Sequence, residues 1–402
     1  MAVWAKIKMY WSSMLTASGA VVVASSTEAT GDYDVAYLSN FLGVNSWLAA
    51  SSATTTISCT QTGQYSNGDF ELAAITGWIG EVAGTGAGTF AINSTAPYVG
   101  TYDGKFTITN PGTDITHIFV KPDDQIGSIK KGRVYKVLFG CNGQAAQTVR
   151  IALIGASSPF TVYATNVDKT ITTSYAQYEA TFTALQDADD VHVVFYMGNG
   201  GTWVQIDDIV FDEEEAVCSD YALAYGHNFL PETGTIPTLK LEYSDDNSTW
   251  TAVDTSLDGD TIHISSTKLW EFTKTAGHKY WRWSTTSPGN TTQIKCLLWG
   301  LKTELDFCSV SFDPDQFSPK KTVNTTYKGN VAGIHLDYNQ RQMSFRINDA
   351  DDTLYEKVRK YREDHGEKQL FIAWNTAEFP NDIAFMYPTG AFSNPMALTA
   401  IY

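Results

Sequence analysis

The chain has 402 residues, which is too long for one ordinary hydrophobic core, so the length favours two or three domains. Charged residues make up 18% and aromatic residues 13%, a composition typical of a folded β-rich protein that excludes a disordered chain. The formal net charge of −17 disfavours nucleic acid and anionic membranes as partners, because both carry negative phosphate groups.

No stretch reaches the roughly 18 consecutive apolar residues that a membrane-spanning helix needs, so we expect no membrane span. Residues 1–26 have a faint likeness to a signal peptide, but Lys8 and Ser12 interrupt the apolar run, which makes this the less favoured interpretation. The five cysteines form no CxxC pair and are odd in number, so the sequence indicates neither a zinc site nor a full disulfide framework.

Short segments of alternating apolar and polar residues recur between Tyr65 and Asp212, for example "GKFTIT", "TVRIALIG" and "VHVVFYMG". Gly, Asn or Asp turns separate them, so the pattern predicts the strands of a β-sandwich. We place this sandwich at residues 61–215, where the acidic run Glu213 to Glu215 marks its end.

A second set of strands lies on both sides of the first, in "VNSWLAASSATTTISC" upstream and "TLKLEYSDD", "HKYWRWST" and "IKCLLWGLKTEL" downstream. We therefore expect residues 1–60 and 216–305 to form one discontinuous sandwich into which the other is inserted. Cys59 and Cys218 flank the insert and would lie close together, either as a disulfide or, the favoured alternative, as two buried thiols.

The segment "KYWRWS" predicts a strand with Trp281 and Trp283 on one face and Tyr280 and Arg282 on the other. The tryptophan face is expected to be core. Arg282 is expected to stack on a ring or to pair with Asp245 or Asp246, a structural role favoured over contact with a ligand.

Residues 306–402 predict a small α+β unit with one amphipathic helix. The segment "DADDTLYEKVRKYREDHG" carries Leu354, Val358 and Tyr361 on one face, with Asp351 or Asp352 as the N-cap and Gly366 as the stop. Strands such as "QMSFRIN" and "KQLFIAW" lie around it.

Five segments of the insert occur in the order expected for a known family: "NGDFE" (67–71), "GW" (77–78), "YVGTYDGKF" (98–106), "KKGRVYKVLF" (130–139) and "VQIDDIVF" (204–211). Together they resemble carbohydrate-binding modules of families four and nine. The resemblance implies a jelly-roll β-sandwich that binds sugar.

The flanking segments "NSWLAASSATTTISC", "DYALAYGHNF", "LKLEYSDDNSTWTAV", "HKYWRWS" and "IKCLLWGL" resemble discoidin-like domains of the coagulation-factor C type, another jelly roll. Discoidin-like domains with sequence segments of this kind are frequent in tail and fibre proteins of bacteriophages. The last hundred residues have a looser likeness to virion tail proteins. The expected fold class is thus mainly β: two jelly-roll β-sandwiches, one inserted in the other, plus a small C-terminal α+β unit that docks to the virion.

A sandwich binds sugar through aromatic rings that stack on the pyranose C–H groups and through amides and carboxylates that bond its hydroxyls. The candidates are Trp78, Tyr98, Tyr102, Tyr196 and Trp203, with Asn199 and Gln205 as polar partners. For any one of these aromatic residues, core packing is an equal alternative. The glycines of "GWIGEVAGTGAGTF" leave little bulk, so this stretch is interpreted as a loop that lets a ligand approach Trp78.

Four carboxylates meet if the first and last strands of the insert pair, as the resemblance implies: Asp69, Glu71, Asp207 and Asp208. Such a cluster suits a hard cation, and the related modules carry a structural Ca²⁺. The equal alternative is that Asp207 and Asp208 only end a strand or cap a turn.

Catalytic patterns are missing from the sequence. The seven histidines show no HExxH, and neither GxSxG nor a phosphate-binding glycine loop occurs. A glycosidase with paired carboxylates is disfavoured because no acidic residue lies in an apolar, pocket-like context. We expect no enzyme activity.

The expected function is that of a structural and adhesion protein of a phage tail, located in the virion or otherwise extracellular. It would dock in multiple copies to other virion proteins and present the insert to a host-surface glycan. Two alternatives remain: an accessory carbohydrate-binding chain of a secreted glycan-degrading enzyme, and a structural virion protein without a ligand.

Overall fold

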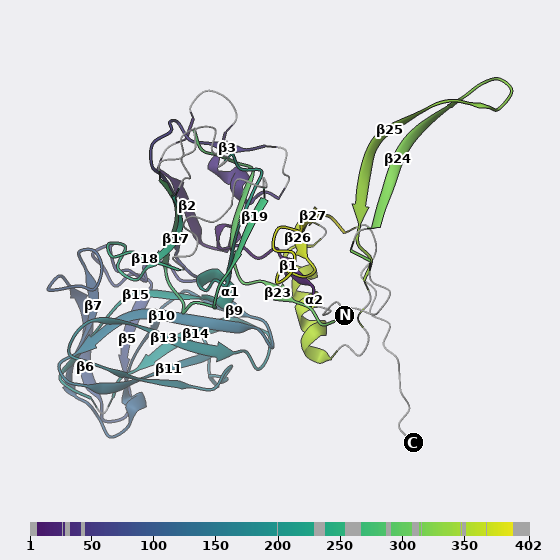
Figure 1. Cartoon of the computed structure of the whole chain (residues 1–402). Helices are drawn as coiled ribbons and strands as arrows, with labels where there is room; N and C mark the ends of the chain where they lie inside the picture. Colours follow the sequence, from purple (N-terminus) through teal and green to yellow (C-terminus); the bar gives the residue numbers. More distant parts are fainter. Residues whose placement is uncertain are drawn as a thin grey trace, which may run out of the picture. The chain divides into compact units, whose positions relative to one another are not determined.

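The computed structural model describes residues 6–25, 27–28, 33–41, 45–198, 200–228, 238–253, 267–286, 291–307, 313–314, 316–345, 347, 351–366 and 368–388. It has two compact units, Ser12–Leu301 and a unit made of Met1–Trp11 with Lys302–Tyr402. Most regular structure is β, in many antiparallel sheets, which confirms the predicted fold class (Figure 1). No helix among these residues is long and apolar enough to cross a membrane.

The middle of the chain forms a sandwich of two antiparallel sheets, drawn in blue to teal (Figure 1). One sheet has the order β13-β10-β15-β7-β6 and the other β12-β11-β14-β8-β5, with β9 pairing to β14. The strands are β5 (Trp78–Val82), β6 (Ala87–Asn93), β7 (Asp103–Asn110), β8 (Ile118–Pro122), β9 (Gly127–Ile129), β10 (Val134–Gly143), β11 (Gln147–Gly155), β12 (Val167–Ile171), β13 (Ala176–Thr183), β14 (Ala188–Tyr196) and β15 (Trp203–Glu213), with the 3-10 helix η3 (Ile115–His117) before β8.

Alternation along these strands fills one core between the two sheets. In β10, Tyr135, Val137 and Phe139 are buried in that core, so Lys136 and Leu138 point to the outer face of the sheet. Strand β15 changes its register with β10 after Leu138, where Asp208 adopts a left-handed backbone with φ of 53°.

The flanking strands form a second sandwich. Its sheets have the orders β18-β17-β20-β4-β2, β19-β16-β22 and β21-β3. The elements are η1 (Met14–Thr16), β2 (Ala20–Ala24), η2 (Val35–Ser39), β3 (Trp47–Leu48), β4 (Thr55–Gln61), α1 (Glu214–Val217), β16 (Tyr221–Tyr225), β17 (Thr238–Ser244), β18 (Thr251–Ala252), β19 (Thr267–Glu271), β20 (Tyr280–Thr286), β21 (Gln293–Ile294) and β22 (Cys296–Gly300). Because β4 pairs with β20, residues from both sides of the insert share one sheet.

Strand β20 shows why these residues form a core. Trp281 and Trp283 are buried with Trp47 and Trp299, as the alternation predicts. Arg282 lies on the other face, 4.1 Å from the centre of the Trp250 ring, which confirms the predicted stacking. Its ion pair is with Glu242 on β17, the residue opposite it in the register, and not with Asp245 or Asp246.

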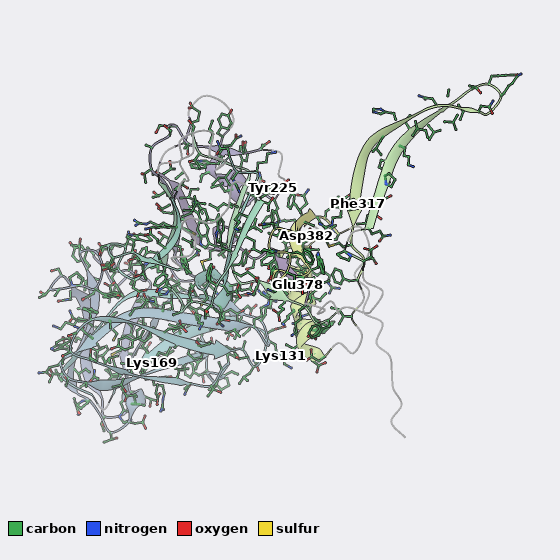
Figure 2. All side chains as sticks on the ribbon, in the orientation of Figure 1. Lys131, Lys169, Tyr225, Phe317, Glu378 and Asp382 are labelled. Carbon is green, nitrogen blue, oxygen red and sulfur yellow. The ribbon has the colours of Figure 1, made fainter. Side chains whose placement is uncertain are left out.

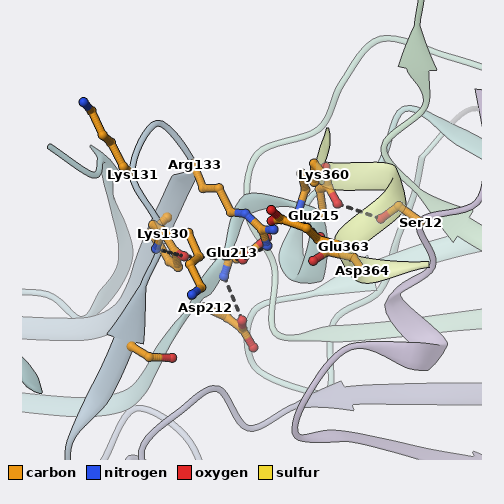
Figure 3. Close-up of polar contacts among 12 residues, drawn as sticks. Ser12, Lys130, Lys131, Arg133, Asp212, Glu213, Glu215, Lys360, Glu363 and Asp364 are labelled. Atoms are coloured by element: carbon orange, nitrogen blue, oxygen red, sulfur yellow. Dashed lines mark hydrogen bonds and ion pairs between the residues drawn. The ribbon is translucent and has the colours of Figure 1, made fainter. Parts of the chain in front are cut away.

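The chain crosses from the flanking sandwich into the insert and back again, and these two crossings lie beside each other. The Gln61 N–H donates to the Lys279 carbonyl at 3.0 Å, and the His278 N–H donates to the Val217 carbonyl at 3.0 Å. Next to the second crossing, the Ser12 hydroxyl donates to Glu215 and Arg133 pairs with Glu213 (Figure 3). The chain thus enters and leaves the insert beside two consecutive residues, His278 and Lys279, just before β20.

Apolar and polar contacts both join the sandwiches. Leu138 and Val210, from the outer face of the five-stranded sheet, are buried in a cluster with Ala216, Val217 and Cys218. Gly277 sits against this sheet: the Gln177 amide donates to its carbonyl at 2.9 Å, its N–H donates to Glu179 at 2.6 Å, and a Cβ there would lie 2.7 Å from Leu138. Asp208 and Lys279 form a buried ion pair beside them.

Cys59 and Cys218 are free thiols, so of the two alternatives the structure has the unpaired one. Both are fully buried. Burial raises the pKa of each thiol to about 12, which keeps both in the unreactive protonated form.

The other compact unit contains a sheet of order β23-β1-β26-β27, the helix α2 (Asp352–Asp364) and the hairpin of β24 (Gln316–Thr325) and β25 (Val331–Gln342). The sheet consists of β1 (Lys8–Tyr10), β23 (Thr303–Glu304), β26 (Leu370–Ala373) and β27 (Ile383–Met386). Strand β1 therefore lies in this unit, whereas the sequence placed residues 1–60 in the flanking sandwich. Ile7, Met9 and Trp11 alternate along it and pack with Leu354 and Tyr361.

Helix α2 matches its prediction closely. The Asp351 side chain accepts the Leu354 N–H at 2.8 Å as the N-cap, and Gly366, with φ of 68°, follows the last turn. Leu354 and Tyr361 are buried on the predicted face.

We predict that the Asp208–Lys279 pair holds the insert in place. Lys279→Met leaves a buried carboxylate without its counter-ion, so it should cost about 3–5 kcal/mol of stability. Lys279→Met with Asp208→Asn should recover most of this, because Asn is neutral and tolerates the left-handed backbone. Calorimetric unfolding measures both variants. Lys131→Met, at an exposed lysine, is the control, and equal unfolding temperatures for the two single variants would refute the role.

A second prediction concerns acid stability. His227 is 4% exposed, and burial lowers its pKa to about 4, from about 6.5 in the unfolded chain. Below pH 6.5 the unfolded state gains a proton that the folded state does not bind, so stability falls toward pH 4 by about 3 kcal/mol in total. The neutral variant His227→Gln should show a smaller fall in thermal midpoint over this range. Comparing the two proteins at each pH cancels the other titrations, and parallel curves would contradict the prediction.

Candidate functional site

The outer face of the five-stranded sheet is occupied over part of its area. The flanking sandwich covers Leu138 and Val210, and the loop at 94–102 crosses the next part of the face. In that loop the Tyr98 and Val99 N–H groups donate to the Asp207 carboxylate at 3.1 and 3.0 Å, and the Gln205 amide donates to the Thr95 carbonyl at 3.2 Å. The chain's own groups therefore occupy this part of the face, while Trp203 and outward residues of β6 and β7 such as Thr89 and Thr107 stay half-buried or exposed.

The outer face of the other sheet carries a row of side chains from five adjacent strands. Register pairs Arg150 with Asp168 and with Tyr196, Tyr196 with Phe119, and Phe119 with Glu81. Their neighbours in sequence, such as Ile151, Phe195 and Val120, are buried in the core, so the row points outward. We call these five residues the cross-strand row: Asp168, Arg150, Tyr196, Phe119 and Glu81.

The centre of the cross-strand row is an aromatic pair. The ring centroids of Phe119 and Tyr196 are 5.6 Å apart and the rings are tilted by 59°. Both side chains are half-buried, so part of each ring faces solvent. Ala152 and Val194, the next outward pair of β11 and β14, lie buried beside them.

Fixed charges flank the aromatic pair on both sides. The Arg150 guanidinium donates to both oxygens of Asp168, at 2.7 and 2.9 Å, and holds the pKa of that carboxyl below its usual range. On the other side Lys121 pairs with Glu81 at 2.9 Å. The row thus offers donors and acceptors, already oriented, around a ring surface.

An open pocket of about 800 Å³ adjoins the cross-strand row and shares Arg150 and Asp168 with it. Its volume lies in the range of small-molecule sites. The Gln147 side chain accepts the Gly201 N–H, and its Nε2 has no partner among the described residues. The other lining residues are Asp114, Ile115, Ala145, Ala146, Thr148, Gly198, Gly200 and Gly201.

Trp78, the first predicted sugar-binding residue, lies in the core and is 2% exposed. Its indole N–H donates to the Ser66 carbonyl at 3.3 Å. The nearby glycines make room for protein side chains and not for a ligand: a Cβ on Gly80 would lie 2.2 Å from Phe90, and one on Gly84 would lie 2.4 Å from the His117 ring. The interpretation of this stretch as a ligand loop is corrected accordingly.

The remaining predicted residues lie on two different faces. Tyr98, Trp203 and Gln205 lie over the five-stranded sheet, whereas Tyr196 belongs to the cross-strand row. Tyr98 packs over Gly140, Trp203 is half-buried with the Lys105 ammonium 4.9 Å from its ring centre, and Gln205 is buried and donates to Asp103 at 3.0 Å. Tyr102 packs against the core, and Asn199 lies outside the described residues.

The four predicted metal ligands each have other partners. Glu71 accepts the Thr101 and Tyr102 N–H groups at 2.7 and 2.9 Å, Asp207 accepts two N–H groups of the covering loop, and Asp208 pairs with Lys279. Asp69 is half-buried near Asp208. Within the described part of the chain no three acidic, His or Cys side chains gather to hold a metal. Ca²⁺ binding by these four residues stays a prediction, and the described residues show no group of side chains arranged to hold the ion.

Sequence inspection missed most of the cross-strand row. Phe119, Arg150 and Glu81 were not singled out, although each alternates with core residues in "HIFVK", "TVRIALIG" and "GWIGEV". The alternation could have shown that they point outward. It could not have shown that they meet, because that depends on the pairing of strands far apart in the sequence.

Comparison with known proteins supports a sugar-binding role for this part of the chain. A family model described as a carbohydrate binding domain (CBM_4_9) matches residues 62–203, a segment that holds the entire cross-strand row. No curated protein matches the chain.

Three solved structures illustrate the similarity. A family 4 carbohydrate-binding module has 21% identity and a TM-score of 0.29, over 34% of this chain and 86% of its own. The N-terminal cellulose-binding domain of Cellulomonas fimi β-1,4-glucanase C has 18% identity and a TM-score of 0.28, over 38% and 95%. The enzymatically active domain of bacteriophage CBA120 tailspike protein 4 has 12% identity and a TM-score of 0.29, over 38% and 21%.

The match to this family of carbohydrate-binding domains thus lies within the inserted β-sandwich, at residues 62–203.

Proposed function

We propose that the inserted sandwich binds a glycan on the outer face of the β12-β11-β14-β8-β5 sheet, with Phe119 and Tyr196 as the platform. The observation that carries this proposal is the cross-strand row: two part-exposed rings between two oriented charge pairs. The opposite outer face is a weaker candidate because the chain's own loop and the flanking sandwich occupy part of it.

In this proposal, recognition needs no chemical step. The apolar C–H face of a pyranose packs on the rings of Tyr196 and Phe119. Its hydroxyls bond to Arg150 and Asp168 at one end and to Glu81 and Lys121 at the other, since these groups supply both donors and acceptors. The adjoining pocket would receive a further part of the chain of sugars.

For the whole protein we propose a structural and adhesion role in a phage tail, with the insert presented to a host glycan and multiple copies bound to other virion proteins. The support is the resemblance of the flanking segments to discoidin-like domains and the separate C-terminal unit. An accessory chain of a secreted glycan-degrading enzyme is the alternative, because a carbohydrate-binding domain fits it equally well.

The binding face can be tested by glycan-array screening and then titration with the retained glycan. Tyr196→Ala and Phe119→Ala should each weaken binding about tenfold or more, since each removes half of the stacking surface. Trp203→Ala, which removes a half-buried ring on the opposite sheet, is the matched control and should leave affinity unchanged.

Loss of binding in Trp203→Ala, with full binding in Tyr196→Ala, would move the site to the other face. Retention of no glycan by the wild-type chain would refute the proposed function. Trp78→Ala is unsuitable as a probe, because it removes a core tryptophan and should cost about 3–5 kcal/mol of stability.

The adhesion role and the accessory role differ in valency. On surfaces coated with increasing densities of the retained glycan, a chain present in several linked copies should dissociate more slowly at high density, because avidity adds to a weak single site. A monovalent accessory chain should dissociate at one rate at all densities. Surface plasmon resonance with the full chain measures this rate, and a density-independent value would favour the alternative.

A further inference from the structure

The hairpin β24–β25 is a two-stranded ribbon within the C-terminal unit. Its register runs from Gln316 opposite Gln342 to Thr325 opposite Val331, with the turn between these last two residues. Phe317 is labelled near the start of the ribbon (Figure 2). Among the described residues no third strand pairs with it.

One face of the ribbon is mainly apolar, with Lys321, opposite Leu336, as the basic residue on it. Val323 lies opposite Ile334, and Leu336 lies two residues beyond, so the three side chains point to the same side. They are 49%, 62% and 50% exposed. Thr322 and His335, opposite each other on the other side, make that face polar. An amphipathic ribbon is therefore present whose apolar face the described part of the chain leaves open.

Such a ribbon is not expected to be stable on its own. An isolated two-stranded hairpin is at best marginally stable in water, because it buries too little apolar surface to offset the entropy of ordering its residues. A third strand, or another surface packed on its apolar face, supplies that burial. The pattern of this segment thus indicates a surface that is covered in the functional state of the protein.

Charge indicates what covers it. The segment 316–342 contains four basic residues, Lys320, Lys321, Lys328 and Arg341, and one acidic residue, Asp337, whereas the whole chain carries −17. Three of the basic residues are exposed lysines, while Arg341 pairs with Asp382. A basic ribbon on a strongly acidic chain is repelled by basic partners and attracted to surfaces like those of the chain itself.

We propose that the β24–β25 hairpin is an assembly arm that packs its apolar face on a second copy of this chain. Val323, Ile334 and Leu336 supply the buried apolar contact, and Lys320, Lys321 and Lys328 supply attraction to the acidic surface of the neighbour. The proposal does not depend on glycan binding, which involves a different part of the chain.

The test is the oligomeric state of the full chain, measured by analytical ultracentrifugation up to roughly 100 µM, a range that includes weak interfaces. The wild type should associate, and more weakly as salt is raised. Val323→Thr/Ile334→Thr/Leu336→Thr should raise the dissociation constant at least tenfold, since Thr keeps strand propensity and removes apolar area. Asn324→Thr/His335→Thr, on the polar face, is the matched control and should associate like the wild type.

Lys320→Glu/Lys321→Glu/Lys328→Glu should abolish association while leaving the circular dichroism spectrum and monovalent glycan affinity unchanged. A monomeric wild type over the full range would overturn the proposal. Protection of the arm amides from hydrogen exchange in such a monomer would show that another part of the same chain covers the ribbon. Association that the apolar-face variant does not weaken would also overturn it.

Discussion

The contact between the five-stranded sheet and the flanking sandwich is the constraint on which the proposed binding face depends. Leu138 and Val210 point away from the core of the insert, and they are buried only because the flanking sandwich covers them. The Asp208–Lys279 pair adds a charge interaction that tolerates little displacement, since either group alone would be buried and unpaired. Because this contact takes part of that face, we propose the opposite face as the one that binds a ligand.

The loop at 94–102 adds to this difference between the two outer faces of the insert. Asp207 and Gln205 point outward from β15, as sugar-binding side chains would, but backbone groups of the loop at 94–102 use their hydrogen-bonding capacity. In the cross-strand row the charged groups bond to one another across strands, as Arg150 does with Asp168. A pair of this kind is oriented in advance and lies at the surface, so a hydroxyl can join it without breaking a backbone contact.

The sequence predicted local structure well and the site only in part. Alternation identified the buried face of Trp281 and Trp283, and the cap at Asp351 located the helix. It could not distinguish a glycine that admits a ligand from Gly80, whose missing side chain makes room for Phe90. Nor could it bring Phe119 beside Tyr196, since their contact follows from the order β14-β8 in a sheet whose strands come from distant segments. Whether a side chain points outward depends on its own strand, but which side chains lie next to it depends on how distant strands pair.

The two proposed surfaces, the cross-strand row and the β24–β25 hairpin, have different roles. Stacking on two half-buried rings gives a weak single site, because much of a sugar's polar surface stays in contact with water. Weak sites become useful when copies are linked, and the proposed role of the amphipathic ribbon is to link them. The acidic charge of the chain opposes crowding of its copies, so a basic segment such as the hairpin is where attraction between copies has to be concentrated. This accounts for an arm that is basic as well as apolar.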